Sequence, residues 1–162
     1  MTPMLVRPIL EPDLPHLLAL LQAKAEFDGM GSSLRATVES LRGALFADNP
    51  LARAVVAEED GVIVGMATYY ATFSSFIVKP GIWLDDLFVS PAKRGNGIGR
   101  SLVKHLCELA IANDCARIDW VVATTNEDGM RFYSRLGASI SEAVRVARLD
   151  LEAITALASA DA

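Results

Sequence analysis

The segment that most constrains this chain spans residues 94–99 and reads Arg-Gly-Asn-Gly-Ile-Gly. It follows a strand-like run at 81–89 and opens a stretch, 98–112, with apolar residues at helical spacing. Glycines let a backbone turn sharply and approach a ligand closely, and the first amides of a helix have no partner within it. We therefore expect this segment to hold the phosphates of a cofactor at a helix N-terminus.

Two better-known phosphate-binding motifs do not fit the segment. A P-loop needs Lys followed by Ser or Thr after its second glycine, whereas Arg100 follows Gly99. A dinucleotide-binding fingerprint needs a third glycine three residues after the second, where this chain has Arg100 or Leu102. The segment instead has the pattern arginine, any two residues, glycine, any residue, glycine.

Hydrophobic periodicity predicts alternating helices and strands in one domain, 1–162. Asp60 and Gly61 suit a tight hairpin turn between two antiparallel strands. The economical architecture is α/β, a mixed sheet with helices on both faces. The expected strands are 5–9, 54–58, 62–72, 81–89, 117–123 and 143–149, the expected helices are 11–27, 37–46, 98–112 and 126–137 with a short tail helix, and 74–80 is an expected loop.

Composition narrows the function classes. The chain has 162 residues, is 52% hydrophobic and carries a net charge of −5, which argues against nucleic acid as a partner and permits a cationic substrate. A membrane-spanning helix needs about 18 consecutive apolar residues, and no apolar stretch of this chain approaches that length. No signal peptide is evident either, so we expect a cytoplasmic protein. Cys107 and Cys115 are expected to be reduced, and His16 and His105 lack metal-ligand spacing, so no metal is expected.

Several further segments resemble those of a known family and occur in the same order as in that family. Together with the glycine-rich segment they resemble the GNAT superfamily of N-acetyltransferases, and within it the diamine (spermidine/spermine) branch. The resemblance covers nearly the whole chain and implies an acyl-CoA N-acyltransferase fold, with a mostly antiparallel central sheet flanked by helices, acetyl-CoA as cofactor and a homodimer. The segments are 84–89, Pro91, 94–99, 120–123, Asn126 and 131–138.

The resemblance assigns cofactor-binding residues. The end of the central strand would lie beside the pantetheine arm, although its apolar pattern alone predicts core residues. Asn126 would cap its helix and also contact that arm. The full set is Leu87, Phe88, Val89, Arg94, Gly95, Asn96, Gly97, Ile98, Gly99, Arg100 and Asn126.

The resemblance also assigns catalytic and substrate-binding residues. Tyr133 would protonate the departing thiolate, because a phenol with a pKa of about 10 keeps its proton at neutral pH. Without the resemblance, a tyrosine on a helix beside Phe132 and Leu136 is more often a packing residue. Asp85 and Asp86 are adjacent on a strand, so we expect opposite faces, with Asp85 binding the amine and relaying its proton. Phe27 and Asp28 would line the amine pocket.

Two departures from the branch leave the substrate open between a polyamine and an amino-acid-like amine such as lysine or thialysine. Residues 74–76 read Ser-Ser-Phe where the branch often has an acid and a tryptophan, and 144–146 read Val-Arg-Val where another tryptophan is common. Arg145 would suit a substrate carboxylate. The alternative function is a coenzyme A sensor module without catalysis.

Overall fold

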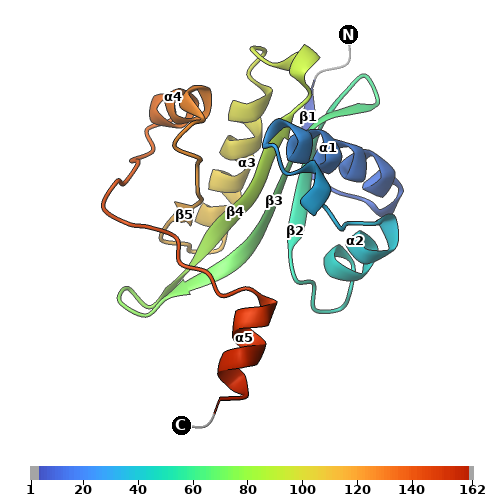
Figure 1. Ribbon diagram of the computed structural model, residues 1–162. Helices are drawn as coiled ribbons and strands as arrows, with labels where there is room; N and C mark the ends of the chain where they lie inside the picture. Colours follow the sequence, from blue (N-terminus) through green and yellow to red (C-terminus); the bar gives the residue numbers. More distant parts are fainter. Residues whose placement is uncertain (1–3, 161–162) are drawn as a thin grey trace. The chain divides into compact units, whose positions relative to one another are not determined.

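The computed structural model describes residues 4–160, which divide between Val121 and Val122 into two compact units (Figure 1). The first unit contains a five-stranded sheet with three α-helices, and the second contains two α-helices. The elements of the first unit are β1 (Leu5–Pro8), α1 (Leu14–Phe27), α2 (Val38–Leu45), β2 (Arg53–Glu59), β3 (Val62–Ser74), β4 (Lys79–Val89), α3 (Ile98–Ala112) and β5 (Ile118–Asp119), and those of the second are α4 (Glu127–Arg135) and α5 (Leu151–Ala158).

The sheet has the strand order β1-β2-β3-β4-β5, in which every neighbouring pair is antiparallel except β4 and β5. This confirms the expected α/β fold with a mostly antiparallel sheet. The turn between β2 and β3 is built on Asp60 and Gly61, whose φ angles of 51° and 77° are the left-handed values that a tight hairpin requires.

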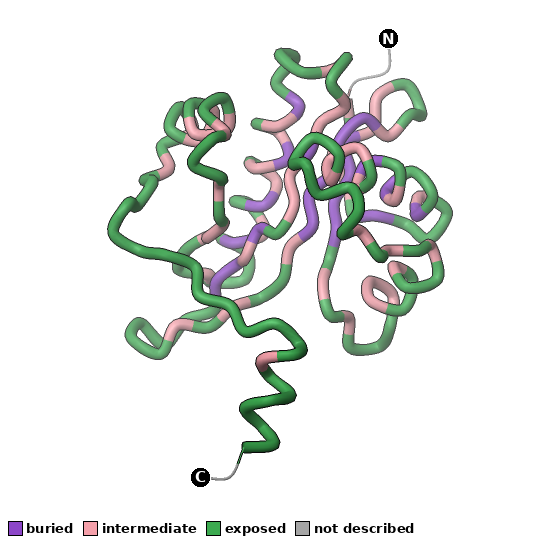
Figure 2. The backbone as a smooth tube through the Cα atoms, viewed as in Figure 1, coloured by how far each residue is buried: buried purple, intermediate pink, exposed green. Residues whose placement is uncertain are grey.

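Helices cover both faces of the sheet, as expected. Leu14 and Leu17 of α1 pack with Val56 and Met66 on one face, where α2 also contributes. On the other face, Leu102 of α3 belongs to a second core cluster with residues of β2, β3 and β4. Figure 2 shows the buried residues concentrated in the strands and along α1 and α3. The sheet therefore separates two cores.

An ion-pair network joins β1, β2 and the segment before α1. The Arg7 guanidinium on β1 donates to both carboxylate oxygens of Asp13, at 2.6 and 3.1 Å, and to Glu58 on β2 at 2.8 Å. The backbone amide of Leu10 also donates to Asp13, at 2.8 Å. The bidentate geometry holds β1, β2 and the segment before α1 together.

The expected strand at 143–149 is wrong. Within the described residues no strand pairs with this segment, and Val144 and Val146 are exposed. Its alternating valines have β propensity, but a strand also needs a hydrogen-bonded neighbour. The expected strand at 117–123 shrinks to β5, and the loop between β3 and β4 spans only 75–78. The expected first helix begins as a 3-10 turn at Glu11–Asp13.

No helix in the described part of the chain is both long and apolar enough to cross a membrane.

Candidate active site

A β-bulge at Asp85 shapes the centre of β4. Thr68 of β3 pairs with Asp86 and Tyr69 pairs with Leu84, so Asp85 has no partner residue on β3. Leu84 and Leu87 consequently lie in the same core cluster, although strict alternation would place them on opposite faces. We expected Asp85 and Asp86 to point to opposite faces because side chains alternate along a regular strand. The bulge interrupts this alternation at Asp85, so the basis of that expectation does not hold here.

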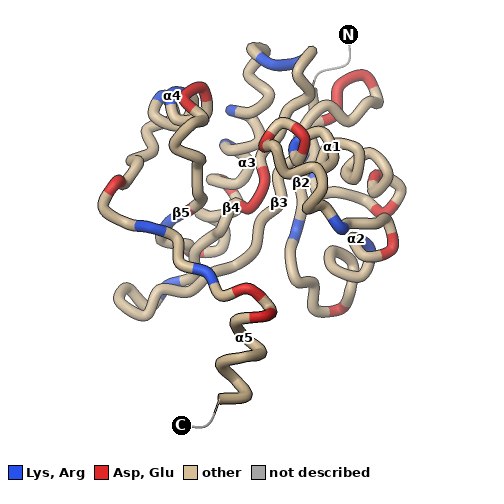
Figure 3. The backbone as a smooth tube through the Cα atoms, viewed as in Figure 1, with Lys and Arg blue, Asp and Glu red and all other residues tan. Residues whose placement is uncertain are grey.

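Asp86 is a functional candidate that the sequence analysis did not single out. The Thr68 hydroxyl donates to Asp86 Oδ2 at 2.6 Å, and Lys24 Nζ lies 3.4 Å from Asp86 Oδ1. The Asp86 side chain is only 22% exposed. The sequence signal that could have identified Asp86 is its position next to Asp85, a predicted site residue. Figure 3 shows this acidic stretch as a red band on β4.

Lys24 connects Asp86 to Asp28, which the sequence analysis placed in the amine pocket. Lys24 Nζ donates at 2.6 Å to Oδ2 of Asp28, the residue that directly follows α1. These three charged side chains, with apolar neighbours, border a pocket of about 230 Å³. Its lining residues are Leu21, Lys24, Ala25, Asp28, Met30, Ser33, Leu34 and Asp86. We call it the acidic pocket.

The surroundings of Asp85 raise the pKa of its carboxyl above the ordinary value. Desolvation is the largest cause, and the negative charge of Asp86 adds to it. A hydrogen bond from Trp83 and the positive charge of Lys24 lower this pKa but do not outweigh the other two. A carboxylate with a raised pKa is a stronger base, which suits a group that accepts a proton.

Arg94 and Phe27, two predicted site residues, are brought together. The Arg94 guanidinium carbon lies 4.8 Å from the centroid of the Phe27 ring and 5.1 Å from that of Phe88. Its Nε donates to the Val89 carbonyl at 3.1 Å. The guanidinium is thus held over two aromatic rings, whereas the sequence analysis assigned its charge to phosphates.

The N-terminus of α3 has the geometry expected of an anion site. Gly95 and Gly97 have φ angles of 84° and 79°, and Gly97 is the N-cap residue. No side chain caps this helix, and the amides of residues 98–100 have no acceptor among the described residues. A Cβ added at Gly95 or Gly97 would meet no atom within 4 Å, so space is open beside the loop. Asn96 and Arg100 are exposed.

An open edge of β4 adjoins this loop. β5 pairs with β4 only at Ile82 and Trp83, so the part of β4 at 84–89 has no strand on that side among the described residues. Leu87 and Val89 are partly buried on the α3 side, whereas Phe88 is buried on the α1 side. Unpaired backbone groups on a strand edge can bind an extended ligand that carries amides.

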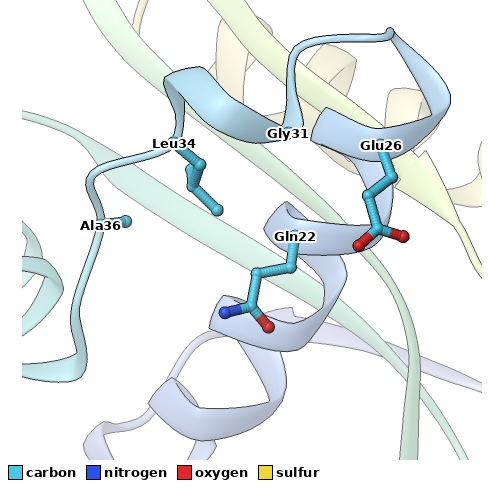
Figure 4. A pocket seen from close by; sticks show the side chains of 5 residues that line it. All are labelled: Gln22, Glu26, Gly31, Leu34 and Ala36. Atoms are coloured by element: carbon cyan, nitrogen blue, oxygen red, sulfur yellow. The ribbon is translucent and has the colours of Figure 1, made fainter.

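A second hollow of about 300 Å³ lies beside α1, lined by Gln22, Glu26, Gly31, Leu34 and Ala36 (Figure 4). The only charged group in this lining is Glu26, and none of these residues was a predicted site residue. Within residues 4–160 no cluster of three His, Cys, Asp or Glu side chains could hold a metal ion.

The remaining predicted site residues lie in the second unit. Asn126 caps α4, since its side chain accepts from the Gly129 amide at 3.0 Å. Tyr133 lies on α4 with its ring edge-on to Phe132, at a centroid distance of 5.2 Å. The capping role of Asn126 is confirmed. The contact of Asn126 with a cofactor and the catalytic role of Tyr133 stay predictions.

Comparison with known proteins identifies the class. Residues 17–138 match the acetyltransferase (GNAT) family, so the chain belongs to that family and is an N-acetyltransferase. It is 29% identical over 146 residues to the thialysine N-epsilon-acetyltransferase of Sus scrofa, covering 85% of each chain.

Two further relatives extend the comparison. The chain is 31% identical over 133 residues to the human spermidine/spermine N(1)-acetyltransferase-like protein 1, covering 78% of this chain and 19% of that one. An integron cassette protein from the mobile metagenome of V. cholerae has a similar structure, with a TM-score of 0.80 and 26% identity over 99% of this chain and 100% of that chain.

Proposed function

We propose that this protein transfers the acetyl group of acetyl-CoA to a primary amine of a small cationic substrate, by direct attack while both are bound. The observation that carries the proposal is the uncapped, glycine-flanked N-terminus of α3 beside the open edge of β4. A diphosphate fits the first feature and an extended arm with amide groups fits the second. Family membership supports the same ligand.

In this proposal the diphosphate loop, the edge of β4 and the acidic pocket have separate tasks. Amides at 95–100 bind the diphosphate, with Arg100 adding positive charge, and backbone groups at 87–89 bind the arm. Bound acetyl-CoA supplies a thioester carbonyl that an amine can attack. The acidic pocket, whose lining carries one net negative charge, receives the amine substrate, and Phe27, 58% exposed and stacked with Arg94, offers an aromatic face beside it.

Protons must move for the reaction to balance. A nitrogen–carbon bond forms and the carbon–sulfur bond breaks, so the amine loses a proton and the sulfur gains one. Asp85 accepts the proton from the amine, directly or through water, which its raised pKa favours. Tyr133 donates a proton to the sulfur, a task assigned by its place in the family motif.

The amine is either a polyamine or diamine, or a lysine- or thialysine-like amino acid. Relatives named for thialysine and for spermidine/spermine support both classes. The resemblance to the diamine branch also leads us to propose a homodimer.

Thiol release from acetyl-CoA with a panel of amines tests the proposal. We expect release that depends on the amine, and Tyr133→Phe should slow turnover by about two orders of magnitude, the lower end of the range for general acid catalysis, with coenzyme A affinity unchanged. A non-catalytic sensor would bind coenzyme A and release no thiol with any amine. Full turnover by Tyr133→Phe would remove this tyrosine from the mechanism.

A further inference from the structure

Lys24 places a fixed positive charge inside a pocket that is otherwise suited to cations. Its Nζ lies 2.6 Å from Asp28 Oδ2 and 3.4 Å from Asp86 Oδ1. The side chain is only 23% exposed, so this ammonium is not a freely solvated surface group. Two carboxylates and one ammonium leave the lining of the acidic pocket with one net negative charge.

The hydrogen bonds of the pocket hold this arrangement in place. Asp86 Oδ2 accepts from the Thr68 hydroxyl at 2.6 Å, which leaves Oδ1 to face Lys24. Thr68 lies on β3 and is 8% exposed, so the carboxylate is fixed from within the sheet. Burial lowers the pKa of Lys24, but the bond to Asp28 and the charge of Asp86 outweigh it and raise this pKa above its ordinary value. Lys24 is therefore charged at neutral pH.

A ligand entering this pocket meets charges of both signs. An additional ammonium on the ligand would find each carboxylate already facing a cation, and it would be repelled by Lys24. A ligand carboxylate would find an ammonium to pair with. The apolar lining residues Leu21, Met30 and Leu34 suit a methylene chain between the two ends of such a ligand.

We propose that Lys24 is a specificity-determining residue, a built-in counter-cation of Asp28 and Asp86 that selects amines bearing a carboxylate or a neutral tail over amines with several cationic groups. This inference rests on the proposed function and adds the residue that sets its substrate class. Lys24, which lies in the first unit, would pair with the substrate carboxylate. From the sequence, we expected Arg145 to do this.

The test compares spermidine, whose ionised groups are all cationic, with thialysine, whose α-carboxylate accompanies its ammonium groups and lowers its net charge. The kcat/KM for each is measured by thiol release from acetyl-CoA with the wild-type protein and with Lys24→Met, which keeps an unbranched side chain of similar helix propensity but removes the charge. The ratio of kcat/KM for spermidine to that for thialysine should rise about tenfold in Lys24→Met, the scale of one partly screened charge interaction.

Three control variants separate charge from packing. Lys24→Gln is a second neutral variant and should change the ratio in the same direction. Lys24→Arg keeps the charge and should leave the ratio within about twofold of wild type. Lys79→Met removes a lysine from the exposed pair with Asp114, at 2.7 Å, and should leave the ratio unchanged. Calorimetric titration of spermidine provides a readout without turnover, and binding should tighten only in the two neutral variants.

The possible failures are distinguishable. A wild-type protein that releases no thiol with any amine overturns the proposed function, and the role of Lys24 with it. An active wild type whose ratio stays the same in Lys24→Met and Lys24→Gln overturns the role of Lys24 alone. An equal gain for both substrates would mean that Lys24 merely occupies the pocket, which also contradicts selection.

Discussion

The guanidinium carbon of Arg94 lies 4.8 Å from the centroid of the Phe27 ring, which links the loop before α3 to the C-terminal end of α1. This contact therefore connects the proposed diphosphate loop to the proposed amine pocket within the first unit. Arg94 is assigned here to this link, whereas Arg100, which is exposed and has no ring partner among the described residues, is free to meet a phosphate.

Arg94→Met should lower the free energy of unfolding by about 1 kcal/mol, because it removes a cation held over two rings. The matched variant Arg100→Met should leave stability unchanged and weaken coenzyme A binding several-fold. Urea unfolding and calorimetric titration of coenzyme A measure the two effects. The same profile in both variants would contradict the separate roles.

Gly97→Ala should destabilise the protein by about 1–2 kcal/mol, because a non-glycine residue is strained at left-handed angles. Gly43→Ala is a matched control inside α2, where φ is not positive and a Cβ also meets no atom within 4 Å. It should stabilise by up to about 1 kcal/mol through helix propensity. Urea unfolding of both variants should give opposite signs, and equal signs would contradict this explanation.

The pH dependence of kcat/KM should report Asp85. Its pKa is raised, so the acidic limb of the profile should lie above the ordinary aspartate range, and Asp85→Asn should remove that limb together with most activity. Lys24 lowers this pKa, so Lys24→Gln should move the limb to higher pH. A limb that persists in Asp85→Asn would assign the proton acceptor elsewhere.

Asp85→Asn should not cost stability at neutral pH. A carboxyl whose folded pKa is raised favours folding in its protonated form, so its contribution is lost as pH rises through that pKa. Replacement by the neutral amide is therefore expected to leave the free energy of unfolding at pH 7 equal or higher. A lower value would mean that the Trp83 hydrogen bond dominates.

Asp13 should govern stability in acid. Its pKa is lowered, chiefly by hydrogen bonds from Arg7, so its contribution is present above the unfolded pKa of about 3.9 and is lost as pH falls through the lower folded value. Asp13→Asn should cost about 1–2 kcal/mol at pH 7 and flatten the acid limb of stability. Asp114→Asn, in an exposed pair and at a φ of 52° that asparagine tolerates, should change stability by less than about 0.5 kcal/mol.

Local signals were sufficient for some elements. The apolar spacing of 98–112 predicted α3 with the bounds that the structure has, and Asp60 with Gly61 predicted the hairpin turn. The expected helix at 37–46 is present as α2, and the hydroxyl of Thr37 caps it by accepting from the Ser40 amide at 3.1 Å. These features are formed by residues close together in the sequence, so local sequence patterns are enough to predict them.

Features that depend on pairing between distant segments were missed. The bulge at Asp85 arises from the register between β3 and β4, which no alternation pattern reveals. The strand at 143–149 was predicted from its own valines, without a partner strand. Lys24 on α1 and Asp28, four residues further along the chain, give no sign of a third partner in the sequence, and only the fold brings Asp86 beside them.

The proposed reaction requires that the acetyl group moves from coenzyme A to an amine nitrogen. The protein is incubated with acetyl-CoA labelled at the acetyl carbon and with spermidine or thialysine, and the products are identified by mass spectrometry and NMR. We expect the label on the nitrogen of the amine, together with one equivalent of free coenzyme A. Label that stays on coenzyme A, or that appears only as free acetate, would contradict it.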